Sequence, residues 1–344
     1  GSSNTIFPPP DAVGKVTAAA LNTQTGPIDL CLTGQNTPIV AVVTGLPANG
    51  ILKDGGTTLT VGMLPHTVTG SLTYTPNTSY SGLDSFNFEA RDNQGQFSAE
   101  ATQEVAVQTG DVFISEVMHR PNADQNVYEF VEIYNKGNTP VSLTRIDARR
   151  AQDGNEKDTT DNLVGATIPA NSVRILAPED PTNPSGAIDF RCEWKIDESL
   201  IIRVPLTQWE ALFNASDANC FASAGSRILL FGTGGTVLDL VDMDQASGDC
   251  ASGVFGSYAL QEFHTDFSIP VDNIENDFAG DWGCAASFND VRIGDVIGDT
   301  STITAVPYWK PLFTAEVPCV RGSCCTRGGG CVEDLFLEEC LEIT

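Results

Sequence analysis

The chain is divided into short segments by turn-forming residues, and this feature most limits what it can fold into. Its 344 residues include 32 Gly and 19 Pro, and the apolar runs between them are short. Long stretches with the 3.6-residue period of an amphipathic helix are hard to find. Short apolar segments separated by Gly, Pro, Asn and Asp are typical of sandwiches built from many strands. The length favours two domains rather than one.

The charge balance excludes several classes of partner. The chain has 45 acidic and 18 basic residues, which gives a net charge of −27. Binding nucleic acid or anionic lipid requires clustered Lys and Arg, so neither partner is expected. No apolar run reaches the roughly 18 residues that a membrane helix needs, so membrane insertion is not expected either.

Ten cysteines suggest a secreted protein. They are Cys31, Cys192, Cys220, Cys250, Cys284, Cys319, Cys324, Cys325, Cys331 and Cys340. None forms a C-x-x-C pair, and three His accompany them, so neither zinc nor a redox site is indicated. Disulfides persist in oxidising compartments, which predicts an extracellular or cell-surface location. The first domain has Cys31 alone and the tail has five cysteines, so a bridge between these regions, within one chain or between neighbours, is a hypothesis.

Strand and turn signals alternate through residues 14–109, the first predicted domain. A buried strand is predicted at 38–43, and Asp54-Gly55-Gly56 has the chemistry of a tight hairpin turn. Phe86 and Phe88 alternate with polar neighbours, as a half-buried strand requires.

This segment resembles the cadherin-like, immunoglobulin-type repeats of large bacterial surface proteins. The residues that carry the resemblance are Leu46-Pro47, Gly50-Ile51-Leu52, Tyr74-Thr75-Pro76, Gly82-Leu83-Asp84-Ser85-Phe86, Asp92 and Gly95. The resemblance implies a stalk or spacer module of a secreted bacterial protein, sometimes with calcium.

A second domain is predicted at residues 110–318. The segments that define it are Val112 to Met118, Tyr128 to Gly137, Pro140 to Leu143, Ser226 to Phe231, Thr236 to Val241, and Trp282. These segments resemble the lamin-tail domain, a compact immunoglobulin-like sandwich that also occurs in secreted bacterial proteins. An insertion at 178–224 departs from that pattern, and within it Thr207 has the spacing of a capping box ahead of a short helix.

The two ends of the chain are predicted to be appendages. Residues 1–13 are expected to form an extended strand and linker, because Pro8-Pro9-Pro10 stiffens the chain as polyproline II. Residues 319–344 are too few for a hydrophobic core and would depend on disulfides. They resemble small Cys-rich repeats of secreted bacterial proteins. The predicted fold class is therefore all-β, with two immunoglobulin-like β-sandwiches in tandem and a disulfide-rich C-terminal appendage.

Catalytic motifs are not found in the sequence. His66, His119 and His264 lie in unrelated segments, and neither a G-x-S-x-G elbow nor a P-loop is present. Glu116, Glu129 and Glu132 are the nearest approach to a carboxylate cluster, but they belong to the lamin-tail pattern. The chain is therefore predicted not to be an enzyme, and no cofactor is certain.

Calcium is the one candidate ligand that the sequence offers. Oxygen-bearing side chains gather on two predicted turns, at Asp242, Asp244 and Asp249 and at Asp153, Asn155 and Asp158. Such turns can form a flexible site for a hard cation. Neither group matches the twelve-residue calcium loop, and ordinary Asp- and Asn-rich turns are the favoured explanation for both.

The predicted function is structural, as an extracellular subunit of a fibre or surface layer. Asn4, Thr5, Ile6 and Phe7 form a β-prone segment that could add to the open sheet edge of another copy. An alternative is an adhesin-type module that binds a glycan or another surface protein, with calcium as a candidate cofactor. A third is a non-catalytic part of a secreted hydrolase.

Overall fold

The structure is a computed structural model of the chain. It describes residues 7–118, 130–149, 157–160, 163–179, 198–205, 227–242, 261–263, 282–284, 321–325 and 331–336. Within these ranges the elements are strands and 3₁₀ turns, with no α-helix. The described residues accordingly include no helix of the length and apolarity that crossing a membrane would need.

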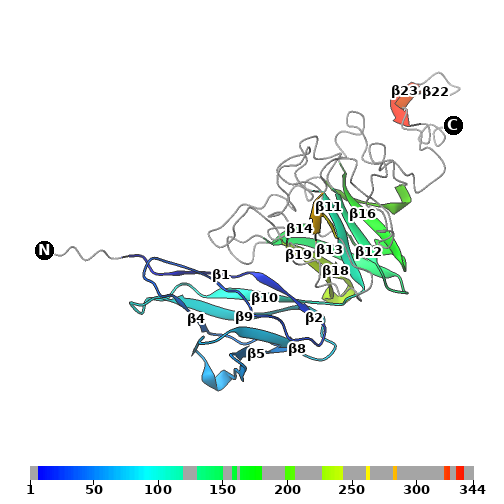
Figure 1. Ribbon diagram of the computed structural model, residues 1–344. Coiled ribbons are helices and arrows are strands. Elements are labelled where there is room, and N and C mark those ends of the chain that lie inside the picture. The colour runs from blue at the N-terminus through cyan, green and yellow to red at the C-terminus, as the bar shows by residue number, and fades with distance from the viewer. Residues whose placement is uncertain are drawn as a thin grey trace.

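The first ten strands build one sandwich (Figure 1, blue to cyan). They are β1 (Asp11–Val13), β2 (Val16–Ala20), β3 (Cys31–Thr33), β4 (Val40–Val43), β5 (Gly50–Asp54), β6 (Thr57–Thr58), β7 (His66–Thr67), β8 (Leu72–Pro76), β9 (Gly82–Arg91) and β10 (Ala101–Gln108). A 3₁₀ turn, η1 (Val61–Met63), lies between β6 and β7. Short strands form here because Gly, Pro and Asn interrupt every apolar run.

Alternating side chains of these strands fill the core of the first sandwich. Strands β6, β5 and β8 form one sheet, while β10, β9, β4 and β7 are consecutive in another. Phe86 and Phe88 of β9 pack with Leu52 of β5 and Tyr74 of β8, and all four side chains are buried. The half-buried strand predicted around Phe86 and Phe88 is confirmed, and so is the turn at Gly55, where φ is +55°.

A second sandwich follows after residue 110. Its strands are β11 (Val112–Met118), β12 (Phe130–Asn135), β13 (Val141–Arg149), β14 (Lys157–Thr160), β15 (Thr167–Ile168), β16 (Ser172–Glu179), β17 (Ile201–Pro205), β18 (Arg227–Gly232), β19 (Val237–Asp242), β20 (Gln261–Phe263) and β21 (Trp282–Cys284). Two 3₁₀ turns complete it, η2 (Glu198–Leu200) before β17 and η3 (Thr233–Gly235) between β18 and β19. The glycine-rich segment at 232–235 forms the turn between the antiparallel strands β18 and β19.

Two sheets enclose the core of the second sandwich. Strands β17, β16, β12, β11, β20 and β21 form a six-stranded sheet, and β14, β13, β18 and β19 face it. Phe113 and Ile133 from the first sheet are packed with Ile146 and Leu230 from the second. Phe113 meets Tyr134 edge to face, with ring centroids 5.4 Å apart.

One sheet continues through both sandwiches. Its strand order is β14-β13-β18-β19-β10-β9-β4-β7, and β19 pairs in parallel with β10 where Val237 lies opposite Gln108. Figure 1 shows β18 and β19 beside the ends of β2 and β10. The observed architecture is therefore all-β with two immunoglobulin-like sandwiches, as predicted, but the two share a sheet.

The C-terminal region contributes one described hairpin, formed by β22 (Arg321–Cys325) and β23 (Cys331–Phe336). The disulfide-rich nature of the appendage stays a prediction. The helix predicted after Thr207 lies outside the described residues.

Candidate functional site

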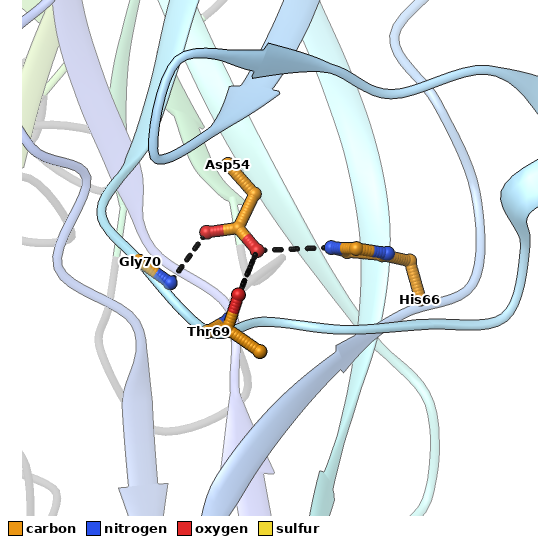
Figure 2. A network of polar contacts seen from close by, with 4 residues as sticks. All are labelled: Asp54, His66, Thr69 and Gly70. Carbon is orange, nitrogen blue, oxygen red and sulfur yellow. Dashed lines mark hydrogen bonds and ion pairs between the residues drawn. The ribbon is translucent and has the colours of Figure 1, made fainter.

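A buried carboxylate fastens two loops of the first sandwich together. Asp54, at the end of β5, accepts hydrogen bonds from the backbone N–H of Thr69 (2.9 Å), its hydroxyl (3.1 Å) and the backbone N–H of Gly70 (2.7 Å). The Nε2 atom of His66 lies 2.9 Å from the same carboxylate. Figure 2 shows these contacts converging on Asp54. We call the group of Asp54, His66, Thr69 and Gly70 the Asp54 clasp.

Local sequence explains why the carboxylate points inward. Gly55 and Gly56 adopt φ of +55° and +89°, so the chain reverses directly after Asp54. Gly70 approaches so closely that a Cβ on it would lie 2.8 Å from the Gly55 Cα. Small residues on both sides thus let the two loops meet around the carboxylate.

The electrostatics of the Asp54 clasp favour the ionised carboxylate. Burial of Asp54 by itself raises the pKa, but the hydrogen bonds from Thr69, His66 and Gly70 outweigh burial and lower the pKa. The Thr69 hydroxyl donates to Asp54 as well, so this residue contributes two donors to the carboxylate. The clasp therefore holds the segment from His66 to Gly70 against the end of β5.

A second polar cluster lies at the opposite end of β8. The buried hydroxyl of Tyr74 donates to Asp84 at 2.8 Å, and Asp84 also accepts from the backbone N–H groups of Ala48 and Asn49. Burial, followed by the hydrogen bond to Asp84, raises the pKa of Tyr74, so the phenol stays protonated. Gly50 leaves room for the ring, because a Cβ there would lie 2.2 Å from it.

A third carboxylate, Asp92, closes the turn between β9 and β10. It accepts from the backbone N–H groups of Gln94 and Gln96 and from the amide of Asn36. Desolvation acts to raise the pKa of Asp92, but these hydrogen bonds lower it. Asp54, Asp84 and Asp92 thus share one role, which is to fix loops of the first sandwich.

The predicted calcium ligands are only partly within the described residues. Asp242 is the last residue of β19 and Asp158 lies in β14, whereas the other four lie outside. Among the described residues no group of three or more His, Cys, Asp or Glu side chains could hold a metal ion. The calcium hypothesis therefore stays a prediction.

The predicted carboxylate cluster is brought together in part. Glu116 of β11 lies opposite Glu132 of β12 in the strand register, and Glu132 is buried. Glu129, His119 and His264 lie outside the described residues.

Of the predicted disulfide residues, Cys31 is described most fully. It lies buried in β3 and is disulfide-bonded, with a partner outside the residues whose side chains are described. Cys284 is in β21, Cys324 and Cys325 are in β22, and Cys331 is in β23. The remaining five cysteines lie outside the described ranges, so the proposed bridge to the tail stays a prediction.

Comparison with protein families finds a matching family for each of the two sandwiches. Residues 16–108 match the family described as Bacterial Ig domain, and residues 106–244 match the family described as Lamin Tail Domain. The chain carries a bacterial Ig domain followed by a lamin tail domain. No curated protein matches the chain. The Ig domain and the lamin tail domain are the two sandwiches that share the ten-stranded sheet.

Sequence reasoning missed the contact between the Ig domain and the lamin tail domain. A signal was present, because Ile228 to Phe231 is an unbroken apolar run, which is typical of a strand buried on both faces. What covers the second face could not be read from that run. The Asp54 clasp was also missed, because its donors lie at least twelve residues along the chain from Asp54.

Proposed function

We propose that the chain is a structural spacer of a bacterial surface or extracellular protein, which holds neighbouring parts at a fixed separation. Bacterial Ig domains occur typically in surface or extracellular proteins, and domains of this type are generally non-catalytic. The observation that carries the proposal is the ten-stranded sheet that joins the two sandwiches into one body.

The use of polar side chains in the Ig domain supports a scaffold role. Asp54, Asp84 and Asp92 each accept three or more hydrogen bonds from loop backbone or neighbouring side chains. A carboxylate that accepts three or four hydrogen bonds in this way stabilises a loop and has little capacity left for a ligand. Buried carboxylates that hold loops in place are consistent with a domain that must keep its shape.

Two measurements test the spacer proposal, the location of the protein on the cell and the rigidity of the purified chain. An antibody against the purified chain should label intact cells of the producing organism, and protease treatment of those cells should remove the label. Small-angle scattering of the purified chain should fit one rigid particle. An exclusively internal location, or hydrolysis of a polysaccharide or peptide by the purified chain, would contradict the proposal.

Assembly into a fibre by strand addition is the finer form of this proposal. It rests on the β-prone segment Asn4 to Phe7 ahead of Pro8, and on Phe7, whose side chain is 36% exposed. Electron microscopy of the chain with and without residues 1–10 tests it, and Phe7→Asp provides a single-residue version. Filaments that vanish in both variants are expected, whereas monomers in all samples would eliminate strand addition.

A binding module is the second candidate, favoured by an apolar protrusion. Val61 is 78% exposed and Met63 is 38% exposed on η1, and the Asp54 clasp fastens the segment that follows them. Exposed apolar side chains on a fixed loop are a common basis for protein recognition. Val61→Asp should abolish capture of a surface protein or glycan in an array experiment, with Val164→Asp on the lamin tail domain as the exposed control.

A further inference from the structure

The hairpin of β18 and β19 carries buried apolar side chains on both of its faces. Ile228, Leu230, Leu238 and Val241 belong to the core of the lamin tail domain. Leu229, Phe231 and Leu240 do not, and they join a separate apolar cluster. These three side chains are nevertheless only 0%, 1% and 2% exposed. An isolated sandwich would leave this second face in water.

The Ig domain covers that face. Val16 of β2 and Ala106 of β10 are buried in the same cluster, and Ala18 and Leu83 pack against it from β2 and β9. Small side chains at Ala18 and Ala106 let the backbones of the two domains approach each other. The large side chains of Leu229 and Phe231 on the lamin tail domain thus share one apolar cluster with Ala18 and Ala106 of the Ig domain.

Backbone contacts fix the relative position of the two domains. Gln108 pairs with Val237 in parallel, and the Ser81 hydroxyl lies 3.0 Å from the carbonyl of Val107 and 3.2 Å from that of Val237. Gly82 has φ of +143°, and a Cβ on it would lie 3.4 Å from the carbonyl oxygen of Gly235 in the β18–β19 turn. A residue with a side chain would be strained at this junction.

The charged side chain of Arg145 packs against Phe231 of the apolar cluster. The guanidinium of Arg145 lies 3.9 Å from the centroid of the Phe231 ring, and its Nε atom is 3.2 Å from the buried carboxylate of Asp147. Arg145 is thereby held over the ring, where it shields Phe231 from water.

We propose that the outer face of the β18–β19 hairpin is a dedicated docking surface for the Ig domain, and that the two domains unfold as one cooperative unit. Interfaces between domains of one chain are usually polar enough to allow relative motion. This one buries large apolar side chains and is joined by the pairing of β10 with β19 at Gln108 and Val237, so separation of the domains would expose an apolar face and break that pairing together. This inference goes beyond the spacer function, which a flexible pair of domains could also serve.

The chain provides separate probes for its two halves. Its four Trp residues, Trp194, Trp209, Trp282 and Trp309, all follow the Ig domain, so their fluorescence reports on the C-terminal half. Hydrogen exchange of peptides from β8, measured by mass spectrometry against denaturant, reports on the Ig domain away from the junction. Coincident midpoints are expected for the unsubstituted chain, and clearly separated midpoints would overturn the proposal.

Two neighbouring leucines provide a matched pair of variants. Leu230→Ala weakens the core of the lamin tail domain, and with coupled domains it should shift the β8 midpoint along with the Trp midpoint. Leu229→Ala removes the same atoms from the junction, and the two midpoints should then separate. A shift of the Trp midpoint alone in Leu230→Ala would overturn the proposal.

A third variant keeps the proposal testable if Leu229→Ala does not fold. Gly82→Ala perturbs the backbone contact at the junction and leaves the apolar side chains of both cores in place. The β8 and Trp midpoints should then separate, as for Leu229→Ala, because the junction is weakened while both cores are kept. Midpoints that shift together in Gly82→Ala would show that coupling does not depend on this junction and would overturn the proposal.

Discussion

Several buried carboxylates of the Ig domain accept hydrogen bonds from backbone N–H groups of loops. A buried carboxylate is costly unless it is fully hydrogen-bonded. Asp54 meets this condition through donors from the segment 66–70, and Asp84 meets it through Tyr74 and the backbone of Ala48 and Asn49. Replacement of such a residue therefore affects loop geometry and stability together.

Replacement of Asp54 by Asn should destabilise the Ig domain. It should also reduce the loss of folding stability that the domain shows as the pH falls. The folded protein holds the pKa of Asp54 below its ordinary value, so the carboxylate stabilises the fold at neutral pH. This contribution is present above the unfolded pKa and is lost as pH falls through the folded pKa. Chemical denaturation at pH 7 should show a loss of about 1–3 kcal/mol, the usual range for a disrupted buried hydrogen-bonded group.

The control for this measurement is Asp29→Asn. Asp29 pairs with Lys15 at 2.8 Å but is 88% exposed, so its loss should cost at most about 1 kcal/mol. A profile of stability against pH that is the same for Asp54→Asn and the unsubstituted chain would show that the clasp does not contribute to acid sensitivity.

Replacement of Tyr74 by Phe should cost about 1–3 kcal/mol, because Asp84 loses a buried donor. The ring still fills the space beside Gly50, so the packing of the core is preserved. Thermal unfolding followed by circular dichroism measures the loss. A variant as stable as the unsubstituted chain would mean that water replaces the phenol.

At the scale of elements, strand edges are completed by segments that are not themselves strands. The outer edge of β8 is covered by residues 25–28, where the N–H groups of Thr25 and Ile28 donate to the carbonyls of Tyr74 and Leu72. The hydroxyl of Thr25 accepts from the N–H of Tyr74 in turn. An edge covered in this way is protected from pairing with another chain.

Replacement of Thr25 by Val tests the protection of this edge. Valine keeps the shape of threonine but cannot accept the hydrogen bond of Tyr74, so the amide proton of Tyr74 should exchange faster by roughly tenfold, for a loss of about 1.4 kcal/mol. Residue-resolved hydrogen exchange provides the measurement, with the amide of Leu52 in the middle of the same sheet as the internal reference. Equal protection of Tyr74 in both proteins would contradict this account.

At the scale of the whole molecule, the junction between the domains decides how the chain behaves. The connection from β10 to β11 is only Thr109-Gly110-Asp111, and Gly110 adopts φ of +90°. A short connection alone would limit motion, but the shared sheet and apolar cluster hold the domains independently of it.

Insertion of the four residues Gly-Ser-Gly-Ser between Thr109 and Gly110 distinguishes restraint by the short connection from restraint by the interface. If the junction holds the domains, the scattering profile should stay close to that of the unsubstituted chain, because a longer flexible linker adds little closure entropy. A marked increase in the radius of gyration would show that the short connection, and not the interface, restrains the domains.

The sequence by itself determined the type of fold and the position of several of the longer strands. Alternation at Phe86 and Phe88, the glycines after Asp54 and the apolar segments around β11, β18 and β19 are local signals, and local sterics convert them directly into strands and turns. Both domain types could be assigned because their motifs are also local.

Only the tertiary structure decided what the second apolar face of β18 contacts and where the Asp54 carboxylate finds its donors. Leu229 and Leu230 are chemically identical neighbours, yet one faces the Ig domain and the other the core of the lamin tail domain. Burial and hydrogen bonding depend on which distant segments meet, and a periodic pattern in the sequence records that a face is apolar without recording its partner.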